Sequence, residues 1–516
     1  MSTNLPVLTG QTALVVGLAR EGTVAALWLA QRGAHVVASD VRPLSALGEA
    51  AARLADHPGI TLRLGPQTPE LLSGVDVVVV SPGVPQDIPL LTAARAAGIP
   101  LTTETRLLAQ LCPALLVGIT GSSGKTTTTT LTARMLEATG ARQGFRTWLG
   151  GNIGEPLLGR VEAMQPEDRV VLELSSFQLL YWGAMPSSHP ETAVPWHRSA
   201  GLSPTVAAIL NITPNHLDRH PSMAHYAAAK AQILAHQRPG AVAVLNRDDP
   251  LVGAWARAGR VTIAGDAGQE PVAFDLAATV LTFGLRSQPW GDGAWWEDET
   301  IRLRYQGEVW TLCHRRELKL RGEHNVANVM AAACLALAAG ADPAAIAAVA
   351  TAFTGVPHRL EVVRRLDDVL WINDSIATSP ERAIAALRSF ETPKVGPAHL
   401  ILLAGGRDKH LPWEDWAAEV HARVRHVVAF GEAAGLIARV LQPKPASSRL
   451  ESLVTAADLP AAVRVAQSLA QPGDVVLLAP GGTSFDAYAD YAARGQHFRD
   501  LVNRLVPLSP PLSEPS

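Results

Sequence analysis

Short runs of apolar residues, each closed by a glycine or a polar residue, recur along most of this chain. The stretches between most of these runs are rich in alanine and compatible with helices. We therefore expect an α/β fold of open parallel sheets covered by helices, and short antiparallel strands over 260–320, where the alternation is poor. Predicted strands cover residues 12–17, 35–39, 75–80, 115–119, 170–174, 206–211, 241–246, 368–373, 399–404, 426–430 and 474–479.

Composition narrows the class of protein. The chain has 516 residues, more than one hydrophobic core supports, which predicts about three domains. Its net charge of −3 gives no electrostatic support for binding nucleic acid or an anionic membrane. The cysteines, Cys112, Cys313 and Cys334, are widely spaced, as expected of buried thiols in a reducing compartment. There is no signal-peptide pattern and no apolar run of membrane length, so we expect a cytoplasmic protein.

One glycine-rich turn carries the clearest chemical signal. Residues 120–126 (TGSSGKT) follow the predicted strand 115–119 and precede a threonine-rich helix. In that context backbone N–H groups bind phosphate oxygens, Lys125 lies against the outer phosphates and the Thr126 hydroxyl reaches the nucleotide's Mg²⁺. The outermost glycine of the strict pattern is missing, because Ile119 stands there. A chance Gly/Ser turn is the alternative, but the flanking strand favours a nucleoside triphosphate site.

The first hundred residues are patterned like half of a dinucleotide-binding sheet. Asp40 follows the second predicted strand, where an acidic residue commonly meets a ribose. The turn 17–22 (GLAREG) lacks the middle glycine of GxGxxG because Ala19 stands there, which disfavours a nicotinamide cofactor and leaves a smaller nucleotide possible. Residues 81–83 (SPG) form another strand-end turn. A purely structural α/β lobe is the alternative.

Polar residues also follow the strands of the middle region. Glu173 lies near the end of 170–174 beside the phosphate loop, where a carboxylate can hold Mg²⁺; the alternative is an edge-strand glutamate in solvent. His216 and His220 follow the strand 206–211, at the edge where chemistry usually occurs in parallel sheets, although a lone histidine is usually structural. Lys230 stands among small apolar residues, and a solvated helix lysine is its default interpretation.

The last third of the chain repeats the strand-and-turn pattern. Residues 374–375, 405–409 and 480–484 follow three predicted strands and are expected to meet at one edge of a sheet as a binding crevice. Before them, Gly322 caps an alanine-rich helix that runs to about Ala339. The amides Asn325 and Asn328 near its start either bind a nucleotide or serve as ordinary caps.

Taken together, these motifs resemble the Mur ligase family. They occur in the family's order and span nearly the whole chain. The matching stretches are GITGSSGKTT (118–127), GGNIG (150–154), LELSSFQL (172–179), LNITPNHLDRH (210–220), YAAAK (226–230), GEHNVAN (322–328), GVPHRLE (355–361), INDS (372–375) and TSFD (483–486).

The resemblance implies three domains: a Rossmann-like lobe for a UDP precursor at 1–111, a P-loop ATPase-like domain at 112–356 and a Rossmann-like domain for ATP and glutamate at 357–506. The Pro/Ser-rich tail 507–516 is expected to be disordered. The implied reaction is ATP-driven amide bond formation in cytoplasmic peptidoglycan precursor synthesis, through an acyl phosphate. The motifs are most similar to the branch that adds D-glutamate to UDP-N-acetylmuramoyl-L-alanine.

Several expectations accompany this reaction. The resemblance implies ATP, two Mg²⁺ ions and small-molecule substrates, with no nucleic acid or membrane partner, and a monomer is expected. The alternatives are a related ligase that takes L-glutamate or another amino acid, a nucleotide-binding switch or motor, and a dehydrogenase. Two departures from the family concern the acceptor: Ile376 stands where a lysine is common, and the segment 182–205 has no counterpart in shorter relatives.

The resemblance also carries site roles onto individual positions. The catalytic residues are Lys125, Glu173, His216 and Lys230. The metal ligands are Thr126, Glu173, His216 and Lys230, the last as a carbamate formed with CO₂. The ATP-binding residues are Gly121, Ser122, Ser123, Gly124, Lys125, Thr126, Thr127, Asn325, Arg359 and Asp374. Uridine would contact Asp40, Arg42, Ser81 and Gly83; the muramoyl-alanine part Asn152, Ser175 and Gln178; and the incoming glutamate Thr378, Lys409, Ser484 and Tyr491.

Acceptor recognition gives a first prediction. Glutamate carries two carboxylates, so its site needs at least one cation. Lys409 is the only lysine in the matching strand-end turns, because Ile376 has replaced the other. We predict that Lys409→Ala raises the KM for glutamate far more than the KM for ATP, and that adding Ile376→Lys partly compensates. Steady-state kinetics with each substrate varied would check this, and an equal rise in both KM values would contradict it.

Overall fold

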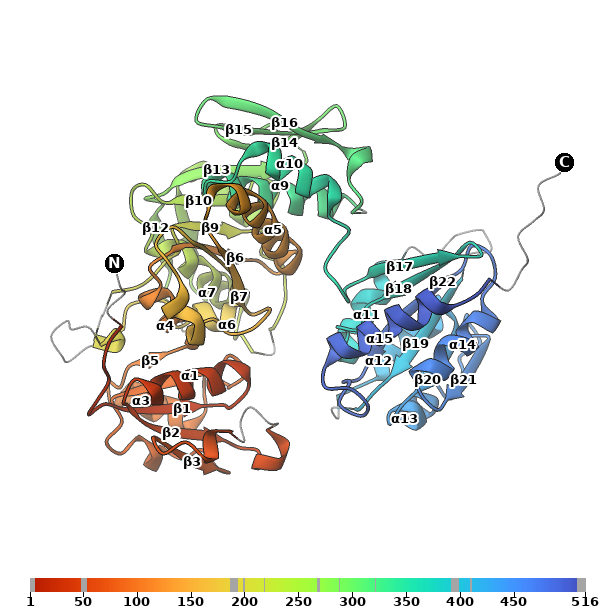
Figure 1. Cartoon of the computed structure of the whole chain (residues 1–516), viewed down its shortest axis with the longest axis horizontal. Coiled ribbons are helices and arrows are strands. Elements are labelled where there is room, and N and C mark those ends of the chain that lie inside the picture. The colour runs from red at the N-terminus through yellow and green to blue at the C-terminus, as the bar shows by residue number, and fades with distance from the viewer. Residues whose placement is uncertain are drawn as a thin grey trace. The chain divides into compact units, whose positions relative to one another are not determined.

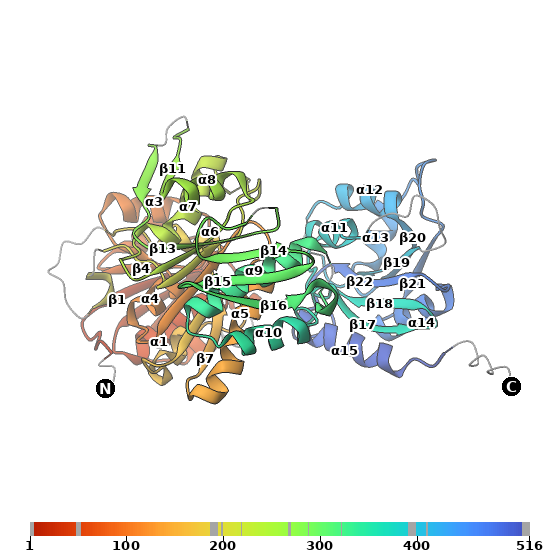
Figure 2. The ribbon, with the colours of Figure 1, turned by 90° about the horizontal axis from the view of Figure 1, so that it is seen from above.

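The computed structural model describes residues 5–47, 53–185, 194–197, 200–217, 219–266, 270–286, 288–320, 322–390, 399–408 and 411–507. The chain divides into two compact units, Met1–Phe353 and Thr354–Ser516, and each is described by itself (Figures 1 and 2). Both units are built from mainly parallel sheets with helices on their faces, so the predicted α/β class is confirmed. Within the described residues, no helix is both long enough and apolar enough to cross a membrane.

The first sheet of the N-terminal unit has five parallel strands in the order β3-β2-β1-β4-β5. Strand β1 is central in the sheet: β2 and then β3 lie on one side of it, and β4 and then β5 on the other. In open α/β sheets, ligands commonly bind where the strand order reverses, which here is at the carboxyl ends of β1 and β4. The elements are β1 (Thr12–Val16), α1 (Arg20–Gln31), β2 (His35–Asp40), β3 (Ile60–Leu64), β4 (Val77–Val80), α3 (Pro89–Ala96), β5 (Leu101–Thr102) and α4 (Glu104–Leu111).

The second sheet has nine strands in the order β16-β15-β14-β13-β10-β9-β6-β8-β7, parallel from β7 to β14. The strands are β6 (Leu115–Thr120), β7 (Thr147–Gly151), β8 (Arg169–Glu173), β9 (Val206–Ile209), β10 (Val242–Asn246), β13 (Thr279–Gly284), β14 (Gly293–Glu297), β15 (Thr300–Tyr305) and β16 (Glu308–His314). Antiparallel pairing over 260–320 is confirmed for β14–β16 and for the separate hairpin β11 (Arg260–Ile263) and β12 (Val272–Asp275). It is wrong for β13, whose buried Leu281 and Phe283 extend the parallel sheet beside β10.

Helices cover both faces of this second sheet (Figure 1). They are α5 (Lys125–Gln143), α6 (Ser176–Leu179), α7 (Met223–Ala235), α8 (Pro250–Ala258), α9 (Glu323–Ala338) and α10 (Pro343–Ala352). Helix α9 begins after Gly322 as predicted, and its residues Val329–Ala336 are all fully buried. A helix that is apolar on every side is one enclosed by other elements, and α9 packs against the sheet and against its neighbours α5 and α10.

The C-terminal unit holds a six-stranded sheet in the order β17-β18-β22-β19-β20-β21, parallel except for the β17–β18 hairpin. Buried apolar residues form one cluster on each of its faces. The elements are β17 (Glu361–Leu366), β18 (Val369–Asn373), α11 (Pro380–Arg388), β19 (Leu400–Gly405), α12 (Glu414–Arg423), β20 (Val424–Phe430), α13 (Ala434–Val440), β21 (Ser452–Ala456), α14 (Leu459–Leu469), β22 (Val475–Gly481) and α15 (Tyr491–Arg504).

The N-terminal unit has two lobes, one around the five-stranded sheet and one around the nine-stranded sheet. Polar contacts from helix α4 join them. The fully buried Arg106 donates to the carbonyls of Tyr181, Gly183 and Ala200, with 2.5 Å to Gly183 O and 3.1 Å to Ala200 O. Burial lowers the pKa of Arg106 to about 10. These carbonyls belong to the 182–205 region or lie beside it, so Arg106 anchors that region; its residues 186–193 and 198–199 lie outside the described part.

Two carboxyl groups lie in the same junction. Glu21, in the first turn of α1, accepts a hydrogen bond from Gln178 Nε2 at 2.8 Å through Oε1. Glu104, the first residue of α4, accepts one from Leu158 N at 2.7 Å. Each has a second, buried oxygen without a partner among the described residues. Burial, then the neighbouring Glu104, raises the pKa of Glu21 to about 8, and burial raises the pKa of Glu104 to about 7.

These raised pKa values predict a pH-dependent stability. The unfolded chain loses both protons near pH 4.5, whereas the folded chain keeps them to about pH 7–8, so stability falls as pH rises through this window. The Glu21→Gln variant has an amide at this position, which cannot ionise. Its thermal midpoint between pH 5.5 and 8 should therefore fall less than that of the parent, by on the order of 5 °C.

Glu308→Gln, at an exposed glutamate of β16, is the matched control and should follow the parent. Calorimetric scans of the three proteins across this pH range would measure the effect. Parallel curves for the parent and Glu21→Gln would show that the carboxyl pair does not hold its protons in the folded chain.

Candidate functional site

The phosphate loop lies between β6 and α5, as predicted. Gly124 has φ 79°, and a Cβ there would lie 2.4 Å from Asn328 Oδ1, so glycine is required for both conformation and space. The loop is held from β9: Ser122 Oγ donates to Thr213 O at 2.9 Å, and Ser123 N donates to Asn211 Oδ1 at 2.8 Å. Lys125 Nζ folds back on the loop and donates to Gly121 O at 2.8 Å and Ser122 O at 3.2 Å.

Lys230 lies directly behind this loop. Its side chain is 1% exposed, and Nζ donates to Gly121 O at 2.9 Å and Thr120 Oγ1 at 3.3 Å. The solvated-lysine interpretation is therefore wrong: helix α7 presents this residue to the interior, over the Tyr226 ring. Burial, together with the positive charge of Lys125, lowers the pKa of Lys230 well below its usual value, against the opposing effect of Glu173. The fold thus makes the Lys230 amine a weaker base than a solvated lysine.

Glu173 ends strand β8, which lies between β6 and β7 in the sheet interior. Its side chain is 2% exposed, so the solvent-facing alternative is wrong. Asn152 Nδ2 donates to Glu173 Oε1 at 2.8 Å, and Glu173 Oε2 is buried without a partner among the described residues. A buried carboxylate oxygen that lacks a donor, beside a phosphate loop, suits a hard divalent cation.

The described residues contain no cluster of three or more His, Cys, Asp or Glu side chains that could hold a metal ion. The four predicted ligands are Thr126, Glu173, His216 and Lys230. Only Glu173 and His216 are of these types. Thr126 and Glu173 each offer oxygen, and Mg²⁺ commonly completes such a set with phosphate and water oxygens, whereas a Lys230 ammonium group would offer no ligand atom.

The three histidines after β9 have different environments. His216 is exposed, with φ 54°. Its ring centroid lies 5.3 Å from that of Phe177, and the two rings are arranged edge to face. His220 is buried; its Nε2 is 2.9 Å from Ser176 Oγ and its Nδ1 is 2.8 Å from His225 Nδ1. Burial, then the nearby positive groups, lowers the pKa of His220 to about 4. His220 is thus a packed structural residue, His225 is half-buried, His216 is exposed, and Asp218 lies outside the described residues.

The residues expected to face uridine gather at the carboxyl ends of β2 and β4. Asp40 is 3% exposed; Arg42 Nε and Nη2 each donate to it at 2.9 Å, and Leu18 N donates at 2.8 Å. Burial opposes ionisation of Asp40, but these hydrogen bonds outweigh it and lower its pKa. Ser81 Oγ donates to Gly17 O at 2.6 Å, and Gly83 is exposed on the turn beyond. The group lies at the carboxyl edge of the first sheet, where its strand order reverses.

The residues expected to face the muramoyl-alanine part lie at the end of β8. Asn152 N donates to Glu173 O at 2.8 Å, so this residue is bound to Glu173 through backbone and side chain. Ser175 caps α6 in a reciprocal box with Gln178. Gln178 is fully buried: Oε1 accepts from Ser175 N and Oγ, and Nε2 donates to Glu21. Gln178 therefore links the two lobes.

Asn325 reaches the phosphate loop through Asn328. Asn328 Nδ2 donates to Asn325 Oδ1 at 3.1 Å, while Thr128 Oγ1 donates to Asn328 Oδ1 at 3.3 Å. These bonds tie the start of α9 to the first turn of α5, directly beside Gly124. The two amides thus belong to the same site as the phosphate loop.

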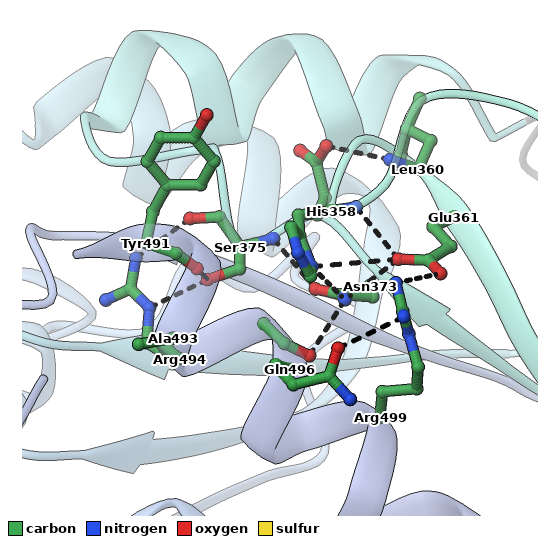
Figure 3. A network of polar contacts seen from close by, with 12 residues as sticks. His358, Leu360, Glu361, Asn373, Ser375, Tyr491, Ala493, Arg494, Gln496 and Arg499 are labelled. Atoms are coloured by element: carbon green, nitrogen blue, oxygen red, sulfur yellow. Dashed lines mark hydrogen bonds and ion pairs between the residues drawn. The ribbon is translucent and has the colours of Figure 1, made fainter. Parts of the chain in front are cut away.

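In the C-terminal unit, the predicted residues lie in the turns before β17 and after β18 and β22, and at the start of α15, where Figure 3 shows Tyr491. Asp374 is 5% exposed and accepts a hydrogen bond from Leu360 N at 2.9 Å, next to the exposed Arg359. Burial raises the pKa of Asp374 to about 6, although the Leu360 hydrogen bond and the charges of Arg359 and Arg382 oppose this. Ser484 is buried, Thr378 is half-buried and Tyr491 is exposed. Lys409 lies outside the described residues.

The sequence analysis missed Arg494. Its fully buried guanidinium donates to Ser375 Oγ at 3.0 Å, Ser375 O at 2.9 Å and Gly482 O at 3.2 Å, joining the turns after β18 and β22. Burial lowers its pKa to about 10. A signal was present: Arg494 shares one face of α15 with the buried Phe498 and Val502, where an arginine is out of place unless it is paired inside.

Family models match three successive parts of the chain. The N-terminal domain of MurD-like Mur ligases matches residues 11–103, the Mur ligase middle domain matches 119–336, and the Mur ligase glutamate ligase domain matches 358–482. A crystal structure of UDP-N-acetylmuramate-alanine ligase from Thermotoga maritima has the same fold, with a TM-score of 0.50 and 18% identity over 96% of this chain and 99% of that one.

Two relatives are similar over nearly their whole length. Both are named UDP-N-acetylmuramoylalanine--D-glutamate ligase. The Symbiobacterium thermophilum protein is 38% identical over 496 residues, covering 96% of this chain and 98% of its own. The Geobacter metallireducens protein is 39% identical over 500 residues, with the same coverage. Likeness of this extent, with all three domain models in order, establishes that the chain belongs to the Mur ligase family.

Proposed function

We propose that this protein joins D-glutamate to UDP-N-acetylmuramoyl-L-alanine at the expense of ATP, in cytoplasmic peptidoglycan precursor synthesis. The observation that carries the proposal is its identity of 38% to a ligase of that name over 96% of the chain. The phosphate loop with Lys125, the buried Glu173 and the strand-end turns of the C-terminal unit supply the groups such a reaction needs.

The reaction has two balanced steps. An oxygen of the alanyl carboxylate attacks the γ-phosphorus of ATP, which forms an acyl phosphate as the bond to ADP breaks. The neutral amine of glutamate then attacks the acyl carbon; phosphate leaves with the bonding pair and the nitrogen gives up a proton. Both steps bring anions together, so cations and backbone donors contribute more than covalent catalysts.

The chain's own residues provide those groups. Lys125 would exchange its hydrogen bonds to Gly121 O and Ser122 O for bonds to the outer phosphates. The N–H groups of the loop donate hydrogen bonds to phosphate oxygens. Arg359 neutralises part of the phosphate charge. Asn325 and Asp374 position the nucleotide. Mg²⁺, when bound, neutralises phosphate charge; Thr126, Glu173, His216 and carbamylated Lys230 would hold two such ions.

Carbamylation of Lys230 is proposed on its environment. Only a neutral amine attacks CO₂, and the buried position favours that form. The product replaces an N–H donor with two carboxylate-like oxygens beside Glu173, whose own Oε2 has no protein partner among the described residues.

The substrates would divide among the lobes. We assign uridine to Asp40, Arg42, Ser81 and Gly83, muramoyl-alanine to Asn152, Ser175 and Gln178, and glutamate to Thr378, Lys409, Ser484 and Tyr491. We place the domain boundaries after residues 111 and 356, with 507–516 as a tail. We further propose a cytoplasmic monomer that acts on small molecules and binds neither nucleic acid nor membrane.

The function is tested with a panel of UDP-muramoyl precursors and amino acids. Phosphate release should require UDP-N-acetylmuramoyl-L-alanine, Mg²⁺ and D-glutamate together. Turnover with L-glutamate or another amino acid, and none with D-glutamate, would establish the alternative acceptor, which the isoleucine at position 376 makes worth testing. ATP hydrolysis without any amino acid would contradict ligation altogether.

Removing the proposed carbamate gives another prediction. Lys230→Ala should lose at least about 100-fold in kcat, the scale seen when one electrostatic group is removed from an active site. Short carboxylic acids should restore part of the activity by supplying the missing oxygens. Lys319→Ala, at an exposed lysine of the same unit, is the control and should respond to neither change. Full activity of Lys230→Ala would contradict the proposal.

A further inference from the structure

The turn before β17 has an unfavourable backbone conformation on two large residues. His358 has φ 63° and Leu360 has φ 45°, in the left-handed region that side chains with a Cβ rarely adopt. Between them, Arg359 is exposed. Such a conformation persists only where surrounding groups hold it, and it occurs most often at functional sites.

The carboxylate of Glu361 holds one side of the turn. It accepts three hydrogen bonds: from His358 N at 2.8 Å and Asn373 Nδ2 at 3.1 Å through Oε2, and from Arg499 Nη2 at 2.7 Å through Oε1 (Figure 3). All three partners are donors, so an acceptor-only group is required here. The turn is thereby tied both to β18 and, through Arg499, to α15.

The other side of the turn is held by Asp374 and by close packing. Asp374 Oδ1 accepts a hydrogen bond from Leu360 N at 2.9 Å. Helix α15 approaches so closely at Gly495 that a Cβ there would lie 2.3 Å from His358 Nδ1. Asn373, which is fully buried, also donates to Gly495 O at 3.1 Å. The backbone on either side of Arg359 is therefore fixed from both directions.

This arrangement keeps the charge of Arg359 at the strand-end edge. Arg359 acts electrostatically on Asp374, whose pKa it lowers against the effect of burial. Its own side chain stays exposed, close enough to Asp374, at the end of β18, for their charges to interact. An arginine with a fixed backbone loses less conformational entropy when it binds a phosphate than one on a mobile loop.

We propose that Glu361 and Arg499 are positioning residues of the ligation reaction, which hold the 358–360 turn so that Arg359 is presented to the nucleotide phosphates. The inference rests on the proposed function for the role of Arg359. Glu361 accepts the backbone N–H that the left-handed conformation turns inward, and Arg499 holds the carboxylate in place. Neither residue touches substrate.

A double-mutant cycle tests this inference. The probe is a non-hydrolysable ATP analogue with Mg²⁺, whose dissociation constant is measured on the full chain by calorimetry. Glu361→Gln places an amide N–H₂ against donors. Both Glu361→Gln and Arg359→Ala should weaken binding about tenfold, the scale of one charge-assisted hydrogen bond. The double variant should bind no more weakly than Arg359→Ala alone, because Glu361 acts through Arg359.

Matched variants separate positioning from general stability. Arg499→Met should also weaken binding of the analogue, whereas Arg499→Lys, which retains a cation, should restore most of it. Asp368→Asn breaks the Arg365–Asp368 ion pair of the same β17–β18 hairpin and should leave binding unchanged. Should Glu361→Gln fail to fold, the Arg499 variants provide the same test, with Arg359→Ala as the common background.

Several outcomes would overturn the inference. The losses of binding free energy in Glu361→Gln and in Arg359→Ala should not add in the double variant. Additive losses would show that Glu361 stabilises the unit and does not act through Arg359. Unchanged binding in Glu361→Gln and Arg499→Met would overturn it directly. Unchanged binding in Arg359→Ala would remove the role of Arg359, while ligation of glutamate by that same variant would leave the proposed reaction standing.

Discussion

Two lysine side chains share one backbone carbonyl at the centre of the N-terminal unit. Lys125 Nζ and Lys230 Nζ lie 2.8 Å and 2.9 Å from Gly121 O. Lys230 is fully buried beside the positive charge of Lys125, and burial and that charge both lower its pKa well below the usual value. Burial distinguishes the two lysines, because Lys125 is only half-buried.

The rest of the site is arranged around this pair. Glu173 supplies the negative charge that opposes loss of the Lys230 proton, and Asn152 orients its carboxylate. The loop itself donates hydrogen bonds to the Thr213 carbonyl and the Asn211 side chain, both after β9, and Asn328 of α9 approaches Gly124 closely. Because these groups come from separate segments, the geometry of the phosphate loop depends on how those segments pack together.

The two units use buried charge in different ways. In the N-terminal unit, burial raises the pKa values of Glu21 and Glu104, which links the junction of the lobes to pH. In the C-terminal unit, Arg494 is buried with its donors satisfied by Ser375 and Gly482, and it joins two strand-end turns. Glu361 has the complementary role, because it accepts from donors on three segments.

The sequence by itself determined the fold class, the phosphate loop and the interior parallel strands other than β13, which was expected to pair antiparallel. An interior parallel strand is buried on both faces, so its apolar run is legible without any partner. The strands that the pattern missed, β3, β5, β7, β17 and β21, all lie at sheet edges, where one side is open and polar residues interrupt the run. The family motifs likewise lie where local sequence specifies a turn.

Only the tertiary structure decided the state of the charged residues. Nothing local distinguishes Lys230 in an alanine-rich helix from a solvated lysine, or Glu173 from an edge glutamate, because burial depends on what packs against them. Glu21 and Glu104 lie far apart in the chain but form one carboxyl pair, and Arg494 contacts the distant Ser375. Desolvation and hydrogen bonding act across space, so the protonation and partners of these groups are set by the assembled fold.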